Sequence, residues 1–314
     1  MKFAVLSDIH GNALSLRLAL ADARAQGAEG YLFVGDYCIS APWANECVHL
    51  MQQLPNARFV CGNDEQHLFV PSGDDGQFEV ARWCAAELTP EHHAWLDRLP
   101  ETLDFTCEGV RIHMAHSSEA FVGKSLHAHF RTATLPERYP TGSVSREALL
   151  ADFRQTLSAD ASFTEAVHRL EEGVYLFGHN HIQANGCFDG RWMINPGSCG
   201  MPLDCGDFCA AYALLTVRDG QVSVEERRIP YDVEALIAQV RETPQYAAAR
   251  VWSETIFSEW RTCREKVASF LYFTEDYARR IGDPRRPFAK DTWQAAHALF
   301  VEEAPRRWPH LFVR

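Results

Sequence analysis

Acidic and histidine side chains follow short apolar segments at several points of this 314-residue sequence. The first such group is Asp8-Ile9-His10, which comes soon after the apolar residues 3–6. Because alternate side chains of a strand point to the same face, we expect Asp8 and His10 to point the same way. A carboxylate and an imidazole so placed are suitable ligands for a divalent transition metal. The same pair could also be the polar turn at the end of an ordinary strand, so the rest of the sequence must decide.

Four further groups of polar side chains occur farther along the chain, most of them directly after an apolar segment. In three of them a glycine lies beside the polar residue, which permits a tight turn and a close backbone approach. The groups are Gly35-Asp36, Gly62-Asn63, His116 and Gly178-His179-Asn180-His181. Together with the first group they supply two carboxylates, one amide and four imidazoles. Seven ligands exceed the four of a tetrahedral ion, and they are suited to two ions that share a bridging carboxylate.

The elements that must position these side chains alternate between strand and helix. Apolar residues recur at helical spacing in residues 13–27 and 43–54, whereas residues 30–34 and 58–61 have the pattern of buried strands. This order predicts parallel strands joined by helical crossovers, which is an α/β organisation. In such sheets ligands bind at the carboxyl ends of the strands, where the first three polar groups fall.

Later in the chain the predicted strands give way to helices. Two antiparallel hairpins are expected, one around Glu108-Gly109 and one around Asp219-Gly220, with further strands between them. Helical patterns are expected over residues 78–98, 233–243, 245–281 and 290–303. The predicted domain, residues 1–232, therefore carries an insertion at about residues 117–172, and a helical C-terminal extension follows at residues 233–314.

Composition limits the class of protein to which the chain can belong. Hydrophobic residues make up 46% of it, which is enough for a sizeable core. The net charge of −12 argues against binding to nucleic-acid polymers or to anionic membranes. We find no apolar run of the ~18 residues that span a membrane, and no signal peptide. We therefore expect a cytoplasmic protein whose ten cysteines, including the cluster Cys199, Cys205 and Cys209, are reduced thiols.

With all five polar groups in this order and spacing, the sequence resembles the calcineurin-like metallophosphoesterases. The resemblance is to the compact bacterial phosphodiesterase branch that begins Ser-Asp-Ile-His-Gly-Asn, and it extends from residue 1 to about residue 217. Asn195-Pro196-Gly197-Ser198 also matches that branch. The resemblance implies a two-sheet β-sandwich flanked by helices in α-β-β-α layers. It also implies that one ion is bound by Asp8, His10 and His181, the other by Asn63, His116 and His179, and that Asp36 bridges the two.

This ligand set implies hydrolysis of phosphate mono- or diesters. Two ions about 3.5–4 Å apart can hold a hydroxide between them and clamp the phosphoryl oxygens. Mixed nitrogen and oxygen ligands favour Mn, Fe or Zn over Mg or Ca. We expect the substrate to be a small nucleotide or a phosphorylated metabolite. The expected catalytic residues are Asp36, Asn63, Asp64 and His116.

Asp64 stands where many members of the family have a histidine that is thought to protonate the leaving group. With a reference pKa near 3.9, an aspartate is a poor acid at pH 7 unless its surroundings raise that value. Asp64 could be a tuned acid, it could orient His116 or a water, or the leaving group could need little help. We favour the last two interpretations together.

The insertion offers basic side chains that could bind the rest of the substrate, and these are Lys124, His127 and Arg131. A solvated basic face is the alternative interpretation of the same residues. The aromatic spacing of Trp252, Ile256 and Trp260 predicts a helix that packs on the sandwich, although it could also cap the active site or form a homo-oligomer.

Two other functions compete with hydrolysis of a small phosphoester. The same metal core serves protein Ser/Thr phosphatases, which need an open groove. The fold also serves as a non-catalytic scaffold for protein partners, but relatives of that kind have lost ligands, and all seven are present here.

Overall fold

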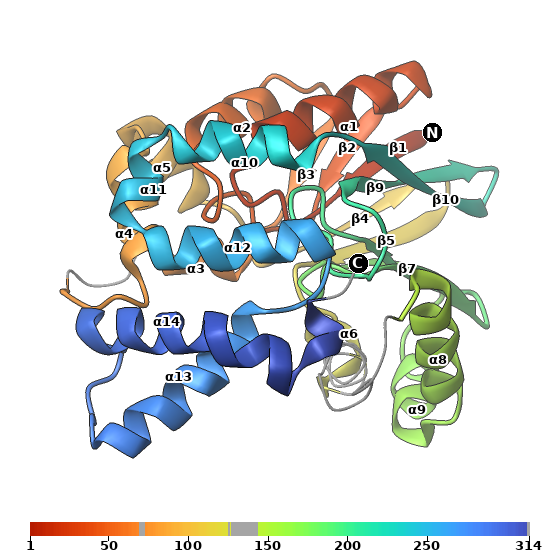
Figure 1. Cartoon of the computed structure of the whole chain (residues 1–314). Coiled ribbons are helices and arrows are strands. Elements are labelled where there is room, and N and C mark those ends of the chain that lie inside the picture. Colours follow the sequence, from red (N-terminus) through yellow and green to blue (C-terminus); the bar gives the residue numbers. More distant parts are fainter. Residues whose placement is uncertain (69–72, 125, 127–143, 313–314) are drawn as a thin grey trace.

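The computed structural model describes residues 1–68, 73–124, 126 and 144–312. Within these residues two five-stranded sheets face each other, and helices cover the outer side of each (Figure 1). The predicted α/β fold, a two-sheet sandwich flanked by helices and followed by C-terminal helices, is confirmed.

The first sheet carries three of the segments that hold the polar groups, which follow β1, β2 and β3. Its strand order is β10-β9-β1-β2-β3, with β1, β2 and β3 parallel and β9 antiparallel to both of its neighbours. The strands are β1 (Lys2–Leu6), β2 (Gly30–Phe33), β3 (Ala57–Phe59), β9 (Cys209–Arg218) and β10 (Gln221–Pro230). The parallel strands are joined by the crossover helices α1 (Ala13–Ala25) and α2 (Ala44–Gln52), as predicted.

The second sheet has the order β4-β5-β6-β8-β7, with a parallel centre of β5, β6 and β8 and antiparallel strands at both edges. Its strands are β4 (Thr102–Cys107), β5 (Val110–Ala115), β6 (Gly173–Leu176), β7 (Gln183–Phe188) and β8 (Arg191–Pro196). Both predicted hairpins are present. Positive φ angles at Glu108 (45°) and Gly109 (82°) give the first of them a turn that matches the twist of its strands.

Strand β1 is buried on both faces, which explains its uninterrupted apolar sequence. Phe3 and Val5 lie in the core between the two sheets. Ala4 and Leu6 point the other way and pack against the helices of the outer layer. The strand that leads to Asp8 is therefore fixed from both sides.

Helices cover the outer faces of both sheets. Those on the first sheet include α4 (Glu79–Glu87) and α5 (Pro90–Leu96). The helical pattern expected over residues 78–98 is present as these two helices, because Leu88 is extended and Thr89-Pro90 begins the second one: the Thr89 hydroxyl accepts the His92 N–H.

The described part of the predicted insertion packs on the second sheet. It contains α6 (Glu119–Val122), α8 (Arg146–Ser158) and α9 (Ala161–His168). Phe153 and Phe163 from these helices belong to one buried cluster with Tyr175 and Phe177. This segment therefore supplies the helical layer on that side of the sandwich.

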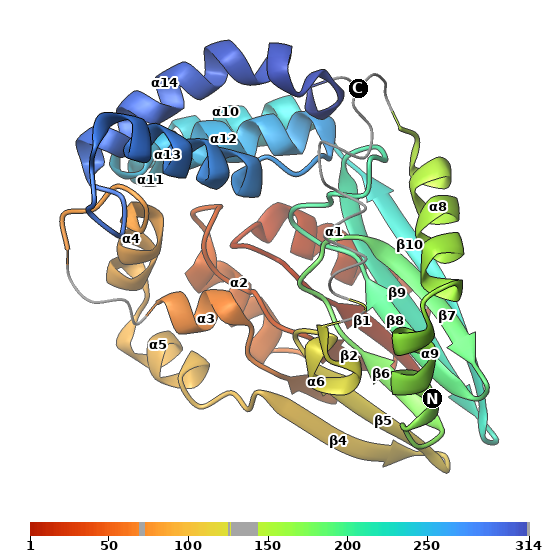
Figure 2. The ribbon, with the colours of Figure 1, turned by 90° about the horizontal axis from the view of Figure 1, so that it is seen from below.

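The C-terminal extension forms a layer along one edge of the molecule, opposite β4 and β5 (Figure 2). The helical pattern expected over about residues 245–281 is present but is divided between helices, and the chain leaves one of these helices at Cys263, where φ is +48°. The extension contains α10 (Val233–Arg241), α11 (Pro244–Ala248), α12 (Arg250–Thr262), α13 (Val267–Ile281) and α14 (Lys290–Arg307). Ile256 and Trp260 are buried, as the packing prediction requires. The domain boundary at residue 232 and a homo-oligomer through these helices stay predictions.

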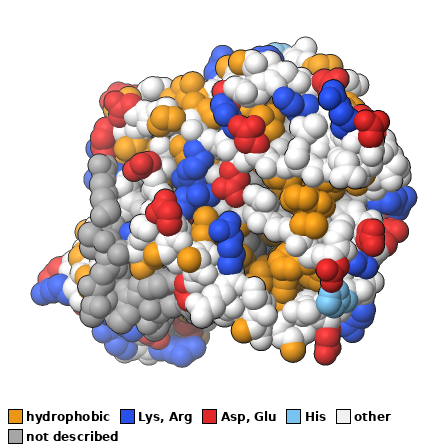
Figure 3. Space-filling view, turned by 90° about the vertical axis from the view of Figure 1, so that its right-hand side faces the viewer, with side chains coloured by type: hydrophobic (Ala, Val, Ile, Leu, Met, Phe, Trp, Pro, Cys, Tyr) orange, Lys and Arg blue, Asp and Glu red, His pale blue; other side chains and the backbone are white. Residues whose placement is uncertain are grey.

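Basic and acidic side chains are interspersed on the face seen in Figure 3, so the net charge of −12 is not gathered in one acidic area there. Among the described residues we find no helix with the length and apolar character needed to cross a membrane.

Candidate active site

The predicted metal ligands, except Asn63 at the start of a short helix, lie in loops, and most of them have unusual backbone conformations. Five of the seven have positive φ angles, which non-glycine residues adopt only where the surrounding structure enforces them. Here hydrogen bonds between two neighbouring loops enforce these conformations. The N–H of Asp8 donates to the carbonyl of Gly35, and the N–H of His10 donates to the carbonyl of Asp36, each at 3.0 Å. The five are Asp8 (53°), His10 (51°), Asp36 (56°), His179 (71°) and His181 (58°). Backbone strain of this kind is concentrated at functional sites.

The first cluster contains Asp8, His10 and His181, all of them buried. The Nε2 atoms of the two histidines are 3.1 Å apart, and Oδ1 of Asp8 lies 3.3 Å from Nε2 of His181. The other ring nitrogen of His181, Nδ1, lies 2.8 Å from the carbonyl oxygen of Met201. Three ligand atoms therefore converge on one point, in the grouping that the resemblance implies.

The second cluster is built around Nε2 of His116. This atom lies 3.2 Å from Oδ2 of Asp36, 3.1 Å from Oδ1 of Asn63 and 3.2 Å from Nδ1 of His179. Nδ1 of His116 is 2.7 Å from the carbonyl oxygen of Val34 and donates to it, so Nε2 is turned toward the cluster.

Asp36 lies between the two clusters. Its carboxylate groups with His116 and His179 on one side and with His10 and Asp64 on the other. Oδ1 accepts the N–H of Asp64 at 2.9 Å, which fixes its orientation. This is the place that a bridging ligand requires.

The electrostatics of both clusters favour added positive charge. Burial alone would lower the pKa of His116, but the charge of Asp36 and a hydrogen bond to it raise that pKa to about 10. The charge of Asp8 likewise outweighs burial and raises the pKa of His181 to about 9. The converging nitrogen and oxygen atoms therefore fit divalent cations, which would supply that charge.

Asp64 contacts His10 and not His116. Its Oδ2 lies 2.8 Å from Nδ1 of His10, so it can hold that ring with Nε2 facing the first cluster. Burial, and then the negative charges of Asp36 and Glu65, raise the pKa of Asp64 well above its usual range. Of the interpretations left open for Asp64, the contact supports orientation of a histidine, which is His10 and not His116, and the raised pKa meets the condition set for a tuned acid.

Glu65 is a positioning residue that the sequence reasoning missed. Its carboxylate accepts the N–H groups of Gly62 (2.8 Å), Asp36 (3.0 Å) and Tyr37 (2.8 Å), and it ties the loop after β2 to the start of α3 (Asn63–His67). Burial and then the charge of Asp36 raise its pKa to about 7. Glu65 lies three residues after the N-cap, as the glutamate of a capping box does, but the N-cap is Gly62, so the Ser or Thr that marks this motif in a sequence is missing.

Glycines leave room for the ligands, as predicted. A Cβ on Gly35 would lie 2.5 Å from Nδ1 of His116, and one on Gly62 would lie 2.1 Å from Oδ1 of Asp36. A Cβ on Gly178 would lie 1.8 Å from Oγ of Ser7. Any side chain at these positions would displace a ligand or its support.

The turn Asn195–Ser198 supports the ligand loops. Asn195 donates through Nδ2 to the carbonyl of Gly178 at 3.1 Å. The hydroxyl of Ser198 donates to the carbonyl of Asp8 at 2.7 Å and accepts the N–H of Met201. These hydrogen bonds explain what Asn195 and Ser198 of the matched motif do: they hold the loops that carry His179 and Asp8.

A cavity of about 330 Å³ opens beside the clusters, and the C-terminal extension forms part of its wall. Trp252 and Glu259 of α12 line it, as do residues at the start of α13. Of the predicted substrate contacts, Lys124 is exposed and is not among the described residues that line this cavity. His127 and Arg131 lie outside the described residues.

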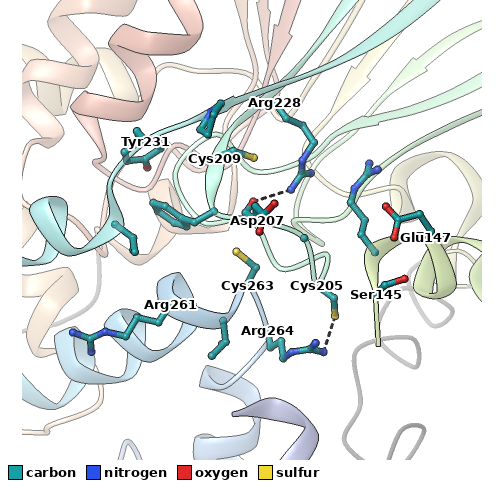
Figure 4. A pocket seen from close by; sticks show the side chains of 16 residues that line it. Ser145, Glu147, Cys205, Asp207, Cys209, Arg228, Tyr231, Arg261, Cys263 and Arg264 are labelled. Carbon is teal, nitrogen blue, oxygen red and sulfur yellow. Dashed lines mark hydrogen bonds between the residues drawn. The ribbon is translucent and has the colours of Figure 1, made fainter. Parts of the chain in front are cut away.

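A second cavity, of about 680 Å³, lies between the end of α12 and the loop after β8 (Figure 4). The side chains of Cys205, Cys209 and Cys263 line it. None of the ten cysteines of the chain forms a disulfide. The N–H of Cys205 donates to the carbonyl of Cys263 at 3.0 Å, and Arg264 donates to the sulfur of Cys205 at 3.1 Å. Arg228 also lines this cavity, and it donates to the carboxylate of Asp204. This junction joins the extension to the loop that carries Met201.

Comparisons with known proteins agree with this geometry. Residues 1–220 match the model of the calcineurin-like phosphoesterase superfamily domain, and the chain belongs to that superfamily. The family and the fold support a hydrolase that acts on phosphoesters.

An uncharacterized protein of Methanocaldococcus jannaschii is 24% identical over 262 residues, which cover 79% of this chain and 96% of that protein. Two solved structures have the same fold. A metallophosphoesterase from Sphaerobacter thermophilus is 23% identical and superimposes with a TM-score of 0.52 over 79% of this chain and 100% of its own. A hypothetical protein from Pyrococcus horikoshii is 16% identical, with a TM-score of 0.58 over 84% of this chain and 99% of its own. Since 84% of the 314 residues is more than the 232 residues that precede the C-terminal extension, that comparison includes part of the C-terminal helices.

Proposed function

We propose that this chain hydrolyses phosphate mono- or diesters of small molecules, using two divalent transition-metal ions of the Mn, Fe or Zn type. The observation that carries the proposal is the pair of ligand clusters with Asp36 between them. Membership in the phosphoesterase superfamily supports the same reaction class.

In this proposal the residues that hold the ions are Asp8, His10 and His181 for one, Asn63, His116 and His179 for the other, and Asp36 for both. The bound pair would lower the pKa of a water molecule and neutralise charge on the phosphoryl oxygens. The chain itself keeps three of the four imidazoles in the correct tautomer. Asp64 does so for His10, and backbone carbonyls do so for His116 and His181.

The leaving group receives little help from the chain in this proposal. Asp64 takes the position at which many members of the family have a histidine, but its carboxylate is engaged with His10 and only 8% of the residue is exposed. The favoured substrates are therefore esters of good leaving groups, or esters whose leaving group is protonated by solvent.

A small substrate fits the cavity better than a protein does, because helices of the C-terminal extension close one side of it. The test is to strip the protein of metal, resupply Mn²⁺ and measure hydrolysis of p-nitrophenyl phosphate, its bis-ester and a phosphoserine peptide. We expect the nitrophenyl esters to be hydrolysed and the peptide to be left intact. Preferred cleavage of the peptide would favour a protein phosphatase, and metal binding with no hydrolysis of any ester would favour a scaffold.

A further inference from the structure

The C-terminal extension contacts one peptide group beside the ligand clusters. This is the peptide that joins Ser40 to Ala41, in the loop that follows β2 and carries Asp36. Its carbonyl accepts a hydrogen bond from Nε2 of Gln245 in α11 at 2.7 Å. Its N–H donates to the carbonyl of His10 at 2.8 Å. One peptide group therefore links the extension to the backbone of a proposed metal ligand.

The loop that contains this peptide has a strained backbone. Ile39 and Ser40 have φ angles of 58° and 68°. A β-branched residue rarely adopts a positive φ, and such conformations persist only where neighbouring contacts enforce them. Gln245 and Ser40 are both buried, at 1% and 3% exposure, so loss of the amide would leave a buried carbonyl without this donor. The side chain of Gln245 is therefore one of the contacts that keep the loop in this conformation.

The extension also packs on the support of the second histidine in the same cluster. Nδ1 of His181 donates to the carbonyl of Met201 at 2.8 Å. Met201 belongs to one buried cluster with Ala41 and with Ile256 and Trp260 of α12. Both histidines of the first ligand cluster thus have their supporting loops held by the extension.

The ligands of the second cluster are oriented by parts of the chain that precede the extension. Nδ1 of His116 donates to the carbonyl of Val34. The bridging residue Asp36 has a support of its own, because its N–H donates to Glu65. Among the described hydrogen bonds, we find none that joins the extension to His116 or Asn63. The contacts of the extension are therefore concentrated on one of the two clusters.

We propose that Gln245 is a positioning residue for His10, through which the C-terminal extension sets the affinity of the ion held by Asp8, His10 and His181. The affinity of the other ion does not depend on this contact. The extension lies beyond the family match of residues 1–220, and the proposal makes it part of the metal centre. This inference rests on the proposed function, because it takes both clusters to be metal sites.

Calorimetric titration of the metal-free protein with Mn²⁺ measures the affinities of the two sites. Gln245→Met removes the amide and nearly keeps the volume of the side chain. In this variant we expect the ion of the first cluster to bind about tenfold more weakly, at the lower end of the range for a support behind a ligating histidine. The ion of the second cluster should keep its wild-type affinity. If Gln245→Met does not fold, Gln245→Asn replaces it with the same expectation, because its amide is one methylene shorter.

Two ligand variants identify the site that is weakened. His181→Ala disables the first cluster, and His179→Ala disables the second. Added to His179→Ala, Gln245→Met should weaken the remaining ion about tenfold. Added to His181→Ala, it should leave the affinity of the remaining ion unchanged.

Phe273→Leu is the control for a general loss of stability. Phe273 is buried between helices of the extension, with its ring 5.6 Å from that of Phe300, and it does not line the active-site cavity. Both Phe273→Leu and Gln245→Met should lower the melting temperature, since one loses core packing and the other leaves a buried carbonyl without its donor. Only Gln245→Met should change the affinity for Mn²⁺.

Wild-type affinity for both ions in Gln245→Met would overturn the inference. So would equal weakening of the two ions, or the same loss of affinity in Phe273→Leu. If the wild-type protein binds two ions and hydrolyses p-nitrophenyl phosphate while the Gln245 variant keeps both affinities, the positioning role is refuted and the proposed function stands. A wild-type protein that neither binds Mn²⁺ nor hydrolyses the ester would refute both.

Discussion

Removal of the Asp64 carboxylate should weaken one metal site and leave the other intact. Oδ2 of Asp64 lies 2.8 Å from Nδ1 of His10, and both residues are buried. Among the described hydrogen bonds, Asp64 contacts no other histidine of the two proposed sites: the rings of His116 and His181 are held by backbone carbonyls instead. Asp64→Ala should therefore affect the ion held by Asp8, His10 and His181.

The magnitude follows from the type of contact. A hydrogen bond to a charged group contributes about 1.5–3 kcal/mol, and mutation of an outer carboxylate behind a ligating histidine typically costs about 10–100-fold in metal affinity. The two figures agree, because 1.4 kcal/mol corresponds to about tenfold. Asp64→Asn keeps an oxygen that can accept from His10, so it should lose less affinity than Asp64→Ala.

Calorimetric titration of the metal-free protein with Mn²⁺ measures both sites. We expect one weakened and one unchanged site in Asp64→Ala. Asp104→Ala is the control, because Asp104 makes the same 2.8 Å contact with Nδ1 of His113 on the second sheet, away from the clusters. The reasoning is refuted if Asp64→Ala binds two ions with wild-type affinity. A thousandfold loss on p-nitrophenyl phosphate in metal-saturated Asp64→Asn would instead assign this residue the role of an acid.

Three further predictions follow from particular contacts. Gly62→Ala would place its Cβ 2.1 Å from Oδ1 of Asp36, so we expect at least a hundredfold loss of ester hydrolysis. Gly27→Ala is the control, because no atom lies within 4 Å of its Cβ. That variant should keep full activity despite some loss of stability. In the proposed function solvent protonates the leaving group, so kcat/KM for substituted phenyl phosphates should fall steeply as the pKa of the phenol rises, and a flat dependence would contradict this. Burial, and then the charge of Glu265, raise the pKa of Glu259 to about 8, above the ~4.3 of an unfolded glutamate. The folded state therefore retains this proton between those values, so the free energy of unfolding measured by urea titration should fall from about pH 5 to pH 8, and less steeply in Glu259→Gln.

The strands and their polar ends could be predicted from the sequence because each strand is a short apolar segment that stops at a ligand. β1 and β6 are buried on both faces, so their side chains are apolar throughout. Next to the ligands, Gly35, Gly62 and Gly178 are required by close contacts, and the same glycines mark the turns in the sequence.

The particular contacts that the C-terminal extension makes at the site could not be predicted, because they join residues that local patterns do not relate. The helical pattern continues past Cys263, yet α13 begins where Glu259 accepts the N–H groups of Lys266 and Val267. The position of Glu259 on the cavity wall depends on how α12 packs over the sandwich, through Ile256 and Trp260. Only the folded chain brings this carboxylate beside the ligand clusters.

The central claim is that one carboxylate, that of Asp36, holds two ions at once. The most direct measurement is the number of Mn²⁺ ions bound per chain, together with hydrolysis of p-nitrophenyl phosphate, in the wild-type protein and in Asp36→Asn. We predict two ions and activity in the wild-type protein, and in Asp36→Asn a loss of activity of about a thousandfold or more with at least one ion bound weakly. Wild-type activity in Asp36→Asn, or hydrolysis by a wild-type protein that binds a single ion, would contradict the account.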